Sequence, residues 1–501
     1  MRRVVIVGGN ATTWLAAAAL LRAFRHRKVD VAVIDSGAPR DAAVGHWTLP
    51  SQRGMHSLIG IGEAEFMRRC GATFKLASEH AGWQGAGSNF LHAHGEIGSD
   101  LGKTIPFYKY LQRQAIAGQS ERPEHYCIAA VAARLGKFAH PMGAENSLTA
   151  GFTYGYHLEA KSYLELLRAH ALGLGARRIS GSIADLELRE DGDLAAVLLA
   201  SGERVEADLF LDCSGREARL MTRLGATQRD SWSTWLPCDR MWSAMAAARD
   251  APAPLTRTTA ANAGWLWWAP LAQSSMIGHV FSSAHLSDDE ALRQLQQSVP
   301  GMGGEPILSR FAPGKRREFW RQNCVALGDA AIELEPLAGA DLHLAQLGLG
   351  MLIELFPLAR GGKAEAVEYN RIMGEHADAL RDFTLAHYRS GRALPGDFWA
   401  AARASPAPAR LAHKLDLYAA SGRIGLLDFE SFEEVDWAWL LLGSGLVPDA
   451  LEMRVHMLLE NMTPVQMAPL RTQIERLASS MPRHIDYLRH QAGQAAQPAR
   501  H

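Results

Sequence analysis

The sequence predicts an α/β fold with a parallel sheet, a second, antiparallel sheet and a mostly helical C-terminal part. Three observations support this class. Short apolar runs at residues 4–7 and 31–34 flank a helical segment at residues 14–24, as expected for parallel strands covered on both faces. Strand and helix patterns then alternate over residues 151–218. From about residue 350 the chain is rich in Ala and Leu and reads as helix.

Length and composition exclude several classes of protein. A chain of 501 residues exceeds what one hydrophobic core usually serves, so we expect two or three layers or subdomains. The net charge of −1 gives no basic surface for nucleic acid or for an anionic membrane. The five cysteines are scattered, odd in number and without CxxC spacing, which argues against a metal site and against a disulfide framework.

Targeting and membrane segments are not expected. Arg2 and Arg3 precede apolar residues as in a signal peptide, but the Gly8-Gly9 turn interrupts the apolar run. No stretch reaches the roughly 18 apolar residues that span a bilayer. We therefore expect a soluble, cytoplasmic protein with no membrane partner.

The turn after the first strand is the first candidate binding site. It resembles the G-x-G-x-x-G turn of dinucleotide-binding folds, in which glycines let the backbone approach a pyrophosphate. Asn10 and Thr13 replace two of the glycines, and we expect both to add bulk at the phosphate. Asp35 ends the second strand, where an acid holds a ribose hydroxyl. Alone, the motif leaves open a turn that binds no nucleotide. The candidate cofactor residues here are Gly8, Gly9, Asn10, Ala11, Thr12, Asp35 and Gly45.

Two later strand ends favour FAD as the nucleotide. The strand at residues 209–211 ends in Asp212-Cys213-Ser214-Gly215, as in flavoproteins with two dinucleotide-binding folds. A further strand at residues 323–327 ends in Gly328-Asp329, followed by Pro336 and Gly339. An Asp at such a tip accepts hydrogen bonds from ribityl hydroxyls. The N–H groups that open the next helix face the electron-rich pyrimidine edge of the flavin.

Residues 264–271 read G-W-L-W-W-A-P-L, an aromatic strand. Trp265 and Trp267 lie on one face of such a strand, and Leu266 and Trp268 lie on the other. Taken alone, the pattern favours core filling. Lys75 lies between apolar neighbours in G-A-T-F-K-L, where a surface lysine is the simpler interpretation.

With these motifs in order, the chain resembles the flavin-dependent halogenases of the tryptophan halogenase family over nearly its whole length. The tryptophan motif at residues 265–270 and G-A-T-F-K-L at residues 71–76 are the most specific matches. Further matches are G-G-x-x-x-x-W at residues 8–14, Y-H-L-E-A at 156–160, L-E-P-L at 334–337, D-F-x-x-x-H-Y at 382–388 and L-G-x-G-L-V-P at 442–448.

The resemblance implies a fold of the FAD monooxygenase type with two dinucleotide-binding domains. It implies a core at residues 1–350, with FAD segments at about 1–50, 155–218 and 320–350, and a helical subdomain at 351–501. It also implies that reduced FAD, delivered by a separate flavin reductase, reacts with oxygen and halide to give hypohalous acid. That acid travels along a tunnel lined by Trp265, Trp267 and Pro270 to Lys75, beside an aromatic substrate. Burial is expected to lower the pKa of Lys75, which suits either a hydrogen-bond donor or a haloamine.

Several positions depart from the family pattern. Ala338 stands where the family has its catalytic Glu. The backbone N–H groups expected to bind halide are those of Ala340 and Asp341, and a carboxylate there would repel an anion. His46 and Trp47 replace two residues of the G-E-A-T-x-P segment. The expected substrate-pocket residues are His46, His92, His94 and Trp437.

Three functions remain open at this point. The first is halogenation of an aromatic or heteroaromatic, indole-like compound of secondary metabolism. The second is oxidation or hydroxylation by an FAD monooxygenase or oxidase, favoured by Gly328-Asp329 and disfavoured by the tryptophan barrier. The third is a degenerate homologue that binds a ligand without turnover. The sequence leaves the substrate, the halide and the oligomeric state open, with a homodimer as one option.

Overall fold

The computed structural model describes residues 3–27, 29–37, 39, 42–99, 101, 105–119, 121–143, 147–249, 251–299, 301–357, 362–389, 394–453, 455, 457 and 463–494. The contacts divide the chain into two compact units, each assembled from three segments. Unit 1 consists of residues 1–72, 158–233 and 307–378. Unit 2 consists of residues 73–157, 234–306 and 379–501.

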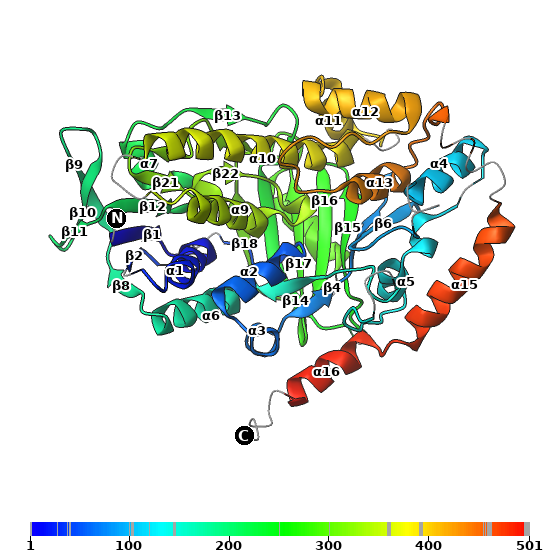
Figure 1. Cartoon of the computed structure of the whole chain (residues 1–501), viewed down its shortest axis with the longest axis horizontal. Helices are drawn as coiled ribbons and strands as arrows, with labels where there is room; N and C mark the ends of the chain where they lie inside the picture. The colour runs from blue at the N-terminus through cyan, green and yellow to red at the C-terminus, as the bar shows by residue number, and fades with distance from the viewer. Residues whose placement is uncertain are drawn as a thin grey trace. The chain divides into compact units, whose positions relative to one another are not determined.

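Unit 1 contains a six-stranded sheet in the order β20-β21-β12-β1-β2-β8. Its strands are β1 (Arg3–Gly8), β2 (Asp30–Asp35), β8 (Arg177–Ser180), β12 (Leu209–Cys213), β20 (Trp320–Arg321) and β21 (Cys324–Ala326). Neighbouring strands in this sheet pair in parallel, except that the short edge strand β20 pairs antiparallel with β21. In Figure 1 the blue strands β1 and β2 lie beside the green strand β12. The apolar runs of the sequence form its inner strands β1, β2, β12 and β21, which are buried on both faces, whereas the edge strand β8 is mostly exposed.

The remaining elements of unit 1 cover or extend this sheet. The helices are α1 (Ala11–Ala23), α2 (Ser51–Ile59), α3 (Glu63–Cys70), α6 (Ala160–Gly173), α7 (Arg219–Arg223) and α9 (Asp341–Glu354). Short 3-10 turns are η2 (Gly215–Glu217), η3 (Gly328–Ala330) and η4 (Pro336–Ala338). Further strands are β3 (Gly45–Trp47), β9 (Ile183–Leu188), β10 (Leu194–Leu199), β11 (Arg204–Glu206), β13 (Arg229–Ser231), β19 (Gly314–Arg316) and β22 (Ile332–Glu333). The long helix α10 (Lys363–Arg389) continues from unit 1 into unit 2.

Unit 2 is organised by a seven-stranded sheet in the order β18-β14-β17-β16-β15-β5-β6. Its strands are β5 (Ala77–Ala81), β6 (Asn89–Ala93), β14 (Arg240–Ala247), β15 (Leu255–Ala261), β16 (Gly264–Pro270), β17 (Ser274–Phe281) and β18 (Met302–Arg310). β15, β16 and β17 form an antiparallel meander, and β14 pairs antiparallel with β17. Beside this sheet, β4 (Thr73–Lys75) pairs antiparallel with β7 (Gly155–Glu159).

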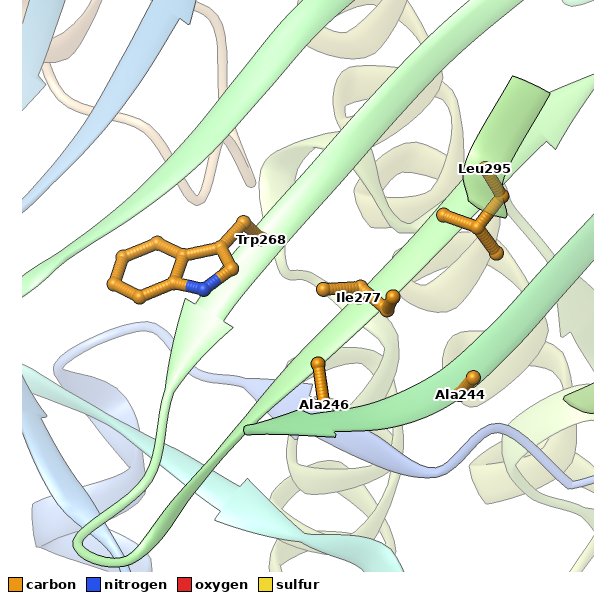
Figure 2. Close-up of a cluster of buried hydrophobic side chains, with 5 residues drawn as sticks. All are labelled: Ala244, Ala246, Trp268, Ile277 and Leu295. Atoms are coloured by element: carbon orange, nitrogen blue, oxygen red, sulfur yellow. The ribbon is translucent and has the colours of Figure 1, made fainter. Parts of the chain in front are cut away.

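Helices accompany the sheet of unit 2. They are α4 (Tyr108–Ile116), α5 (Ile128–Arg134), α8 (Asp288–Ser298), α11 (Asp397–Ala404), α12 (Ala409–Ser421), α13 (Glu434–Gly443), α15 (Pro464–Ser480) and α16 (His484–Gln494), with the turn η1 (Pro123–Tyr126). On one face of the sheet, Trp268, Ile277 and Leu295 of α8 belong to one cluster of buried hydrophobic side chains (Figure 2). The guanidinium of Arg249 lies 4.2 Å from the centre of this ring. Trp268 is therefore a core residue.

The expected fold class is confirmed, since the protein contains a parallel sheet, an antiparallel sheet and C-terminal helices. One expected bound was wrong, because the first helix begins at Ala11 instead of residue 14. The domain boundary expected at about residue 350 falls within α9 and stays a prediction. Within the described ranges, no helix is long and apolar enough to cross a membrane.

Candidate functional site

The carboxyl ends of four parallel strands meet along one edge of the sheet in unit 1. Gly8, the last residue of β1, is in register with Asp35 of β2 and with Cys213 of β12. β21 ends one strand further along and leads directly into Gly328 of η3. The chain adds β2 and β8 on one side of β1, and later adds β12 and β21 on the other side. The edge beside β1 is therefore a topological switch point. Ligands of open α/β sheets bind at such points.

The glycine turn packs closely against the neighbouring backbone. A Cβ on Gly9 would lie 1.9 Å from the carbonyl oxygen of Gly37, and one on Gly8 would lie 2.5 Å from that of Cys213. Asn10 caps α1, since its Oδ1 accepts from the Thr13 N–H at 3.0 Å and its Nδ2 donates to Cys213 O at 3.1 Å. The cap explains why the helix begins three residues earlier than expected.

The expectation that Thr13 adds bulk at the phosphate was wrong. Its side chain is fully buried, and its hydroxyl donates to Asn10 Oδ1 at 2.9 Å. The turn therefore presents the first residues of α1, Ala11 and Thr12, at the positive end of the helix dipole. A diphosphate suits this end.

Asp35 is held by the protein itself. Its Oδ2 accepts from Arg178 Nε at 2.8 Å, and its Oδ1 accepts from the Gly37 N–H at 3.0 Å. Arg178 lies in the neighbouring strand β8. No motif in the sequence indicates the contact between Asp35 and Arg178. The ribose role of Asp35 stays a prediction, and any ribose bond would have to be shared with Arg178.

The Gly328-Asp329 tip lies against the start of α1. Gly328 has φ +61°, and a Cβ there would lie 3.0 Å from Thr12 Oγ1. Desolvation by the surrounding protein, then the carboxylates of Glu333 and Asp341, raise the pKa of Asp329 to about 7. Its side chain nevertheless keeps access to solvent, as a group that receives a ligand must. The edge thus combines a close backbone turn, a helix N-terminus and an accessible carboxylate, a set of groups that fits FAD.

His46 and Asp341 form an ion pair next to this tip. The His46 Nδ1 donates to Asp341 Oδ2 at a short distance. Burial opposes both charges, but the two groups' attraction and hydrogen bond outweigh it, so the pKa of His46 is raised and that of Asp341 is lowered. The repulsion expected between Asp341 and a halide is thereby offset by the imidazolium of His46.

The segment that carries Ala338 is fixed against β3. Gly339 has φ +66°, and a Cβ there would lie 2.7 Å from the carbonyl oxygen of Trp47. Ala340 caps α9 and is buried, and Asp341 is the first residue of the helix. Ala338 is half-buried and carries no group that transfers a proton.

Lys75 lies in unit 2, at the end of β4. Its side chain is 1% exposed, and its Nζ lies 2.8 Å from Nε2 of His94. Burial lowers the pKa of Lys75 to about 7, against an opposing attraction from Asp436. The simpler interpretation of a surface lysine is therefore wrong. A buried amine that is half protonated near neutral pH can act as donor or as nucleophile.

A hydrogen-bonded chain ties the strand of Lys75 to the end of the tryptophan strand. Thr73 Oγ1 donates to Pro270 O at 2.7 Å. His157 Nδ1 lies 2.9 Å from the same hydroxyl and must therefore donate to it, which leaves Nε2 to accept from Thr256 Oγ1 at 3.0 Å. Burial lowers the pKa of His157 well below the usual range, so the ring is neutral and its Nε2 is the accepting nitrogen.

Trp265 and Trp267 lie on the face of β16 opposite to Trp268, and both are buried. Trp265 Nε1 donates to Tyr388 Oη at 3.2 Å. The Trp267 indole lies against Gly278, its partner on β17. The division of the tryptophans between two faces is confirmed. Trp268 belongs to the core, and the barrier expected from Trp265 and Trp267 stays a prediction.

The two histidines of residues 92–95, which read H-A-H-G, contact different groups. His94 contacts Lys75, whereas His92 Nε2 lies 2.8 Å from Asp436 Oδ1 of α13. Trp437 is fully buried, and its Nε1 donates to Glu430 Oε2 at 2.8 Å. Their roles in a substrate pocket stay predictions.

Two residues named above carry no motif, Arg178 and Asp436, whereas His157 belongs to Y-H-L-E-A at residues 156–160. The nearest signal for Asp436 is its place in a capping box with Glu433 at the start of α13. A cap pattern predicts a helix start and says nothing about a contact with His92, so no sequence signal marks that contact.

Comparison with known proteins identifies the family. The model of the tryptophan halogenase family matches residues 3–460. Two curated relatives are the 7-chloro-L-tryptophan 6-halogenase KtzR of Kutzneria sp. (strain 744), 25% identical, and the tryptophan 7-halogenase RebH of Lentzea aerocolonigenes, 26% identical. Each alignment covers 98% of this chain and 99% of the relative.

Solved structures agree with this identification. BrvH, a flavin-dependent halogenase from Brevundimonas sp. BAL3, is 35% identical with a TM-score of 0.91, over 98% of this chain and 99% of that one. Xcc4156, a flavin-dependent halogenase from Xanthomonas campestris, is 32% identical with a TM-score of 0.91, over 98% of both chains. The chain belongs to the tryptophan halogenase family of flavin-dependent enzymes.

Proposed function

We propose that this enzyme halogenates an electron-rich aromatic or heteroaromatic compound, such as an indole, with Lys75 as the residue that directs the halogen. FAD, reduced by a separate flavin reductase, supplies the electrons with which oxygen and halide become hypohalous acid. The net reaction at the substrate replaces one ring hydrogen by halogen and releases water.

The observation that carries the proposal is the state of Lys75. An amine 1% exposed, with a pKa of about 7, has the properties needed to donate a hydrogen bond to hypohalous acid or to be halogenated by it. The bond from Thr73 to Pro270 O fixes the strand of Lys75 to the end of the tryptophan motif. Trp265, Trp267 and Pro270 are proposed as the barrier that separates the flavin from the substrate.

In unit 1 we assign the flavin to the edge formed by Gly8, Gly9, Asn10, Ala11, Thr12, Gly45, Gly328, Asp329, Pro336 and Gly339. The N–H groups of Ala340 and Asp341 are proposed to hold the halide. The His46–Asp341 ion pair supports this assignment, because it removes the net negative charge that Asp341 would otherwise bring.

The test is a two-component assay with a flavin reductase, FAD, bromide or chloride, and a panel of indoles and phenols. Halide-dependent products that carry the mass of bromine or chlorine are expected from the wild type. Lys75→Met is expected to lose at least about 100-fold in rate. Lys161→Met, which removes an exposed lysine, is the matched control and should keep its activity.

A second candidate is a monooxygenase, favoured by the accessible carboxylate of Asp329 beside the start of α1. It predicts a product with one added oxygen that forms equally well without halide. A protein that takes up no FAD on titration contradicts both candidates and supports a binding homologue without turnover.

A further inference from the structure

His94 is fixed in place from both sides by its backbone. It follows β6 directly, and its N–H donates to Leu76 O at 2.8 Å. Its carbonyl oxygen accepts from the Thr153 N–H at 2.8 Å. Leu76 is the residue after Lys75, so the two side chains are tied to the same short piece of backbone. The His94 ring therefore has little freedom to leave Lys75.

The contact between the two side chains is direct and largely shielded from water. Lys75 Nζ and His94 Nε2 are 2.8 Å apart, and His94 is 8% exposed. A lysine ammonium has three donors and no acceptor, so His94 Nε2 must accept when Lys75 is charged. Burial, followed by the charge of Lys75, keeps the pKa of His94 well below its usual range, and the ring is neutral.

The other groups around Lys75 do not replace this acceptor. His157 on β7 and His80 on β5 are neutral because burial lowers both pKa values, and each ring is hydrogen-bonded to a threonine. Asp436 on α13 attracts the charged lysine, but its Oδ1 contacts His92 and its Oδ2 accepts from the Glu433 N–H. The groups that interact with Lys75 are thus His80, His94, His157 and Asp436.

We propose that His94 is a positioning residue for Lys75, which fixes the direction of the Lys75 nitrogen and supplies the acceptor that its charged form needs. The histidine then acts on halogen transfer only through the lysine. This inference rests on the proposed function for its catalytic meaning, although the pairing itself can be measured without turnover.

Removal of the His94 acceptor should change the pKa of Lys75 in a predictable direction. A hydrogen bond to the charged form favours that form, so its loss lowers the pKa of the lysine. Loss of one such hydrogen bond corresponds to a change of about one to two units in the pKa of the lysine. We expect His94→Leu to lower the titration midpoint of Lys75 by that amount. His94→Gln offers an amide oxygen as acceptor and should leave the midpoint near the wild-type value.

The experiment is NMR of the protein labelled with 15N in its lysine side chains. The chain has nine lysines, so the Nζ signals are few, and the signal of Lys75 is assigned by its loss in Lys75→Arg. The signal is followed from pH 5 to 10 in the wild type and in both His94 variants. His125→Leu, at an exposed histidine outside this cluster, is the matched control and should leave the Lys75 midpoint unchanged.

Kinetics provides the second reading. In the two-component assay, the limb of the kcat against pH profile that follows Lys75 should move with the NMR midpoint in His94→Leu and return in His94→Gln. Thermal unfolding of each variant verifies that it is folded. An unchanged Lys75 midpoint in a folded His94→Leu variant overturns the inference. A wild type that makes no halogenated product overturns the proposed function, whatever the NMR result.

Discussion

The indole of Trp267 lies directly on the backbone of Gly278, the residue opposite to it on the neighbouring strand. A Cβ on Gly278 would be 2.4 Å from both Nε1 and Cε2 of that ring. The tryptophan motif on β16 therefore depends on a glycine on β17 that no motif marks. Trp267 keeps its orientation because the opposite position has no side chain.

We expect Gly278→Ala to destabilise the protein by about 1–3 kcal/mol, as overpacking of a core does. The added methyl meets the Trp267 ring and the backbone oxygen of Trp242, and the ring has to move. Urea unfolding followed by tryptophan fluorescence measures both the cost and the displaced indole.

Gly303→Ala, in β18 of the same sheet, is the control. The nearest atom to its added Cβ is 4.0 Å away, so its effect should stay within about 0.5 kcal/mol. Equal effects of the two substitutions would show that the contact with Trp267 is not what matters at Gly278.

Thr73→Val keeps the shape of the side chain and removes the hydroxyl between Pro270 and His157. The Pro270 carbonyl then loses its donor and His157 Nδ1 loses its acceptor, both in a buried place. Each unsatisfied group costs about 1–3 kcal/mol, so we expect a loss of at least about 1 kcal/mol in the free energy of unfolding.

The control for this variant is Thr472→Val, at an exposed threonine of α15. Its change should be within about 0.5 kcal/mol. If Thr73→Val unfolds at the same urea concentration as the wild type, the hydrogen-bonded chain does not hold β4 to β16.

The His46–Asp341 pair should stabilise the protein in a limited pH range. The raised pKa of His46 gives stability that is complete below its unfolded value of about 6.5 and is lost as pH rises through the folded value. The lowered pKa of Asp341 gives stability that is present above about 3.9 and is lost as pH falls through the folded value. Both conditions hold between about pH 4 and pH 6.5.

We therefore expect Asp341→Asn to cost most near pH 5, by less than about 1 kcal/mol, and to cost little above the raised pKa of His46. Urea unfolding at several pH values gives the profile. His46→Gln should lose stability over the same range. A cost that does not change with pH would mean that the two side chains do not ionise as a pair.

Asp329 should make FAD binding pH-dependent. With a pKa of about 7 before binding, it is about 9% ionised at pH 6 and 91% at pH 8. If the carboxylate accepts hydrogen bonds from the ribityl chain, the Kd for FAD should fall about tenfold between these pH values. Fluorescence titration measures the Kd.

Asp329→Asn should bind FAD with the same Kd at pH 6 and pH 8, whereas Asp289→Asn, at an exposed position on α8, should behave as the wild type. A pH-dependent Kd that survives in Asp329→Asn would assign the titration to another group.

The sequence by itself determined the class of fold and the family, and its motifs singled out Lys75 as the candidate catalytic lysine. Apolar runs become parallel strands because both faces of the sheet are covered, and the ends of those strands follow from the glycines and acids that terminate them. Alternation placed Trp265 and Trp267 on one face of β16 and Trp268 on the other, since strand geometry alone sets that division. These are properties of short segments, so the local sequence contains them.

Only the tertiary structure decided which groups the site residues contact. The partners of Asp35, His46 and Lys75 are Arg178, Asp341 and His94, and two of these pairs join residues far apart in the chain. The burial of Lys75 and the accessibility of Asp329 likewise depend on elements packed around them, and these set their pKa values. Long-range contacts and desolvation arise from the assembled fold, and local patterns do not encode them.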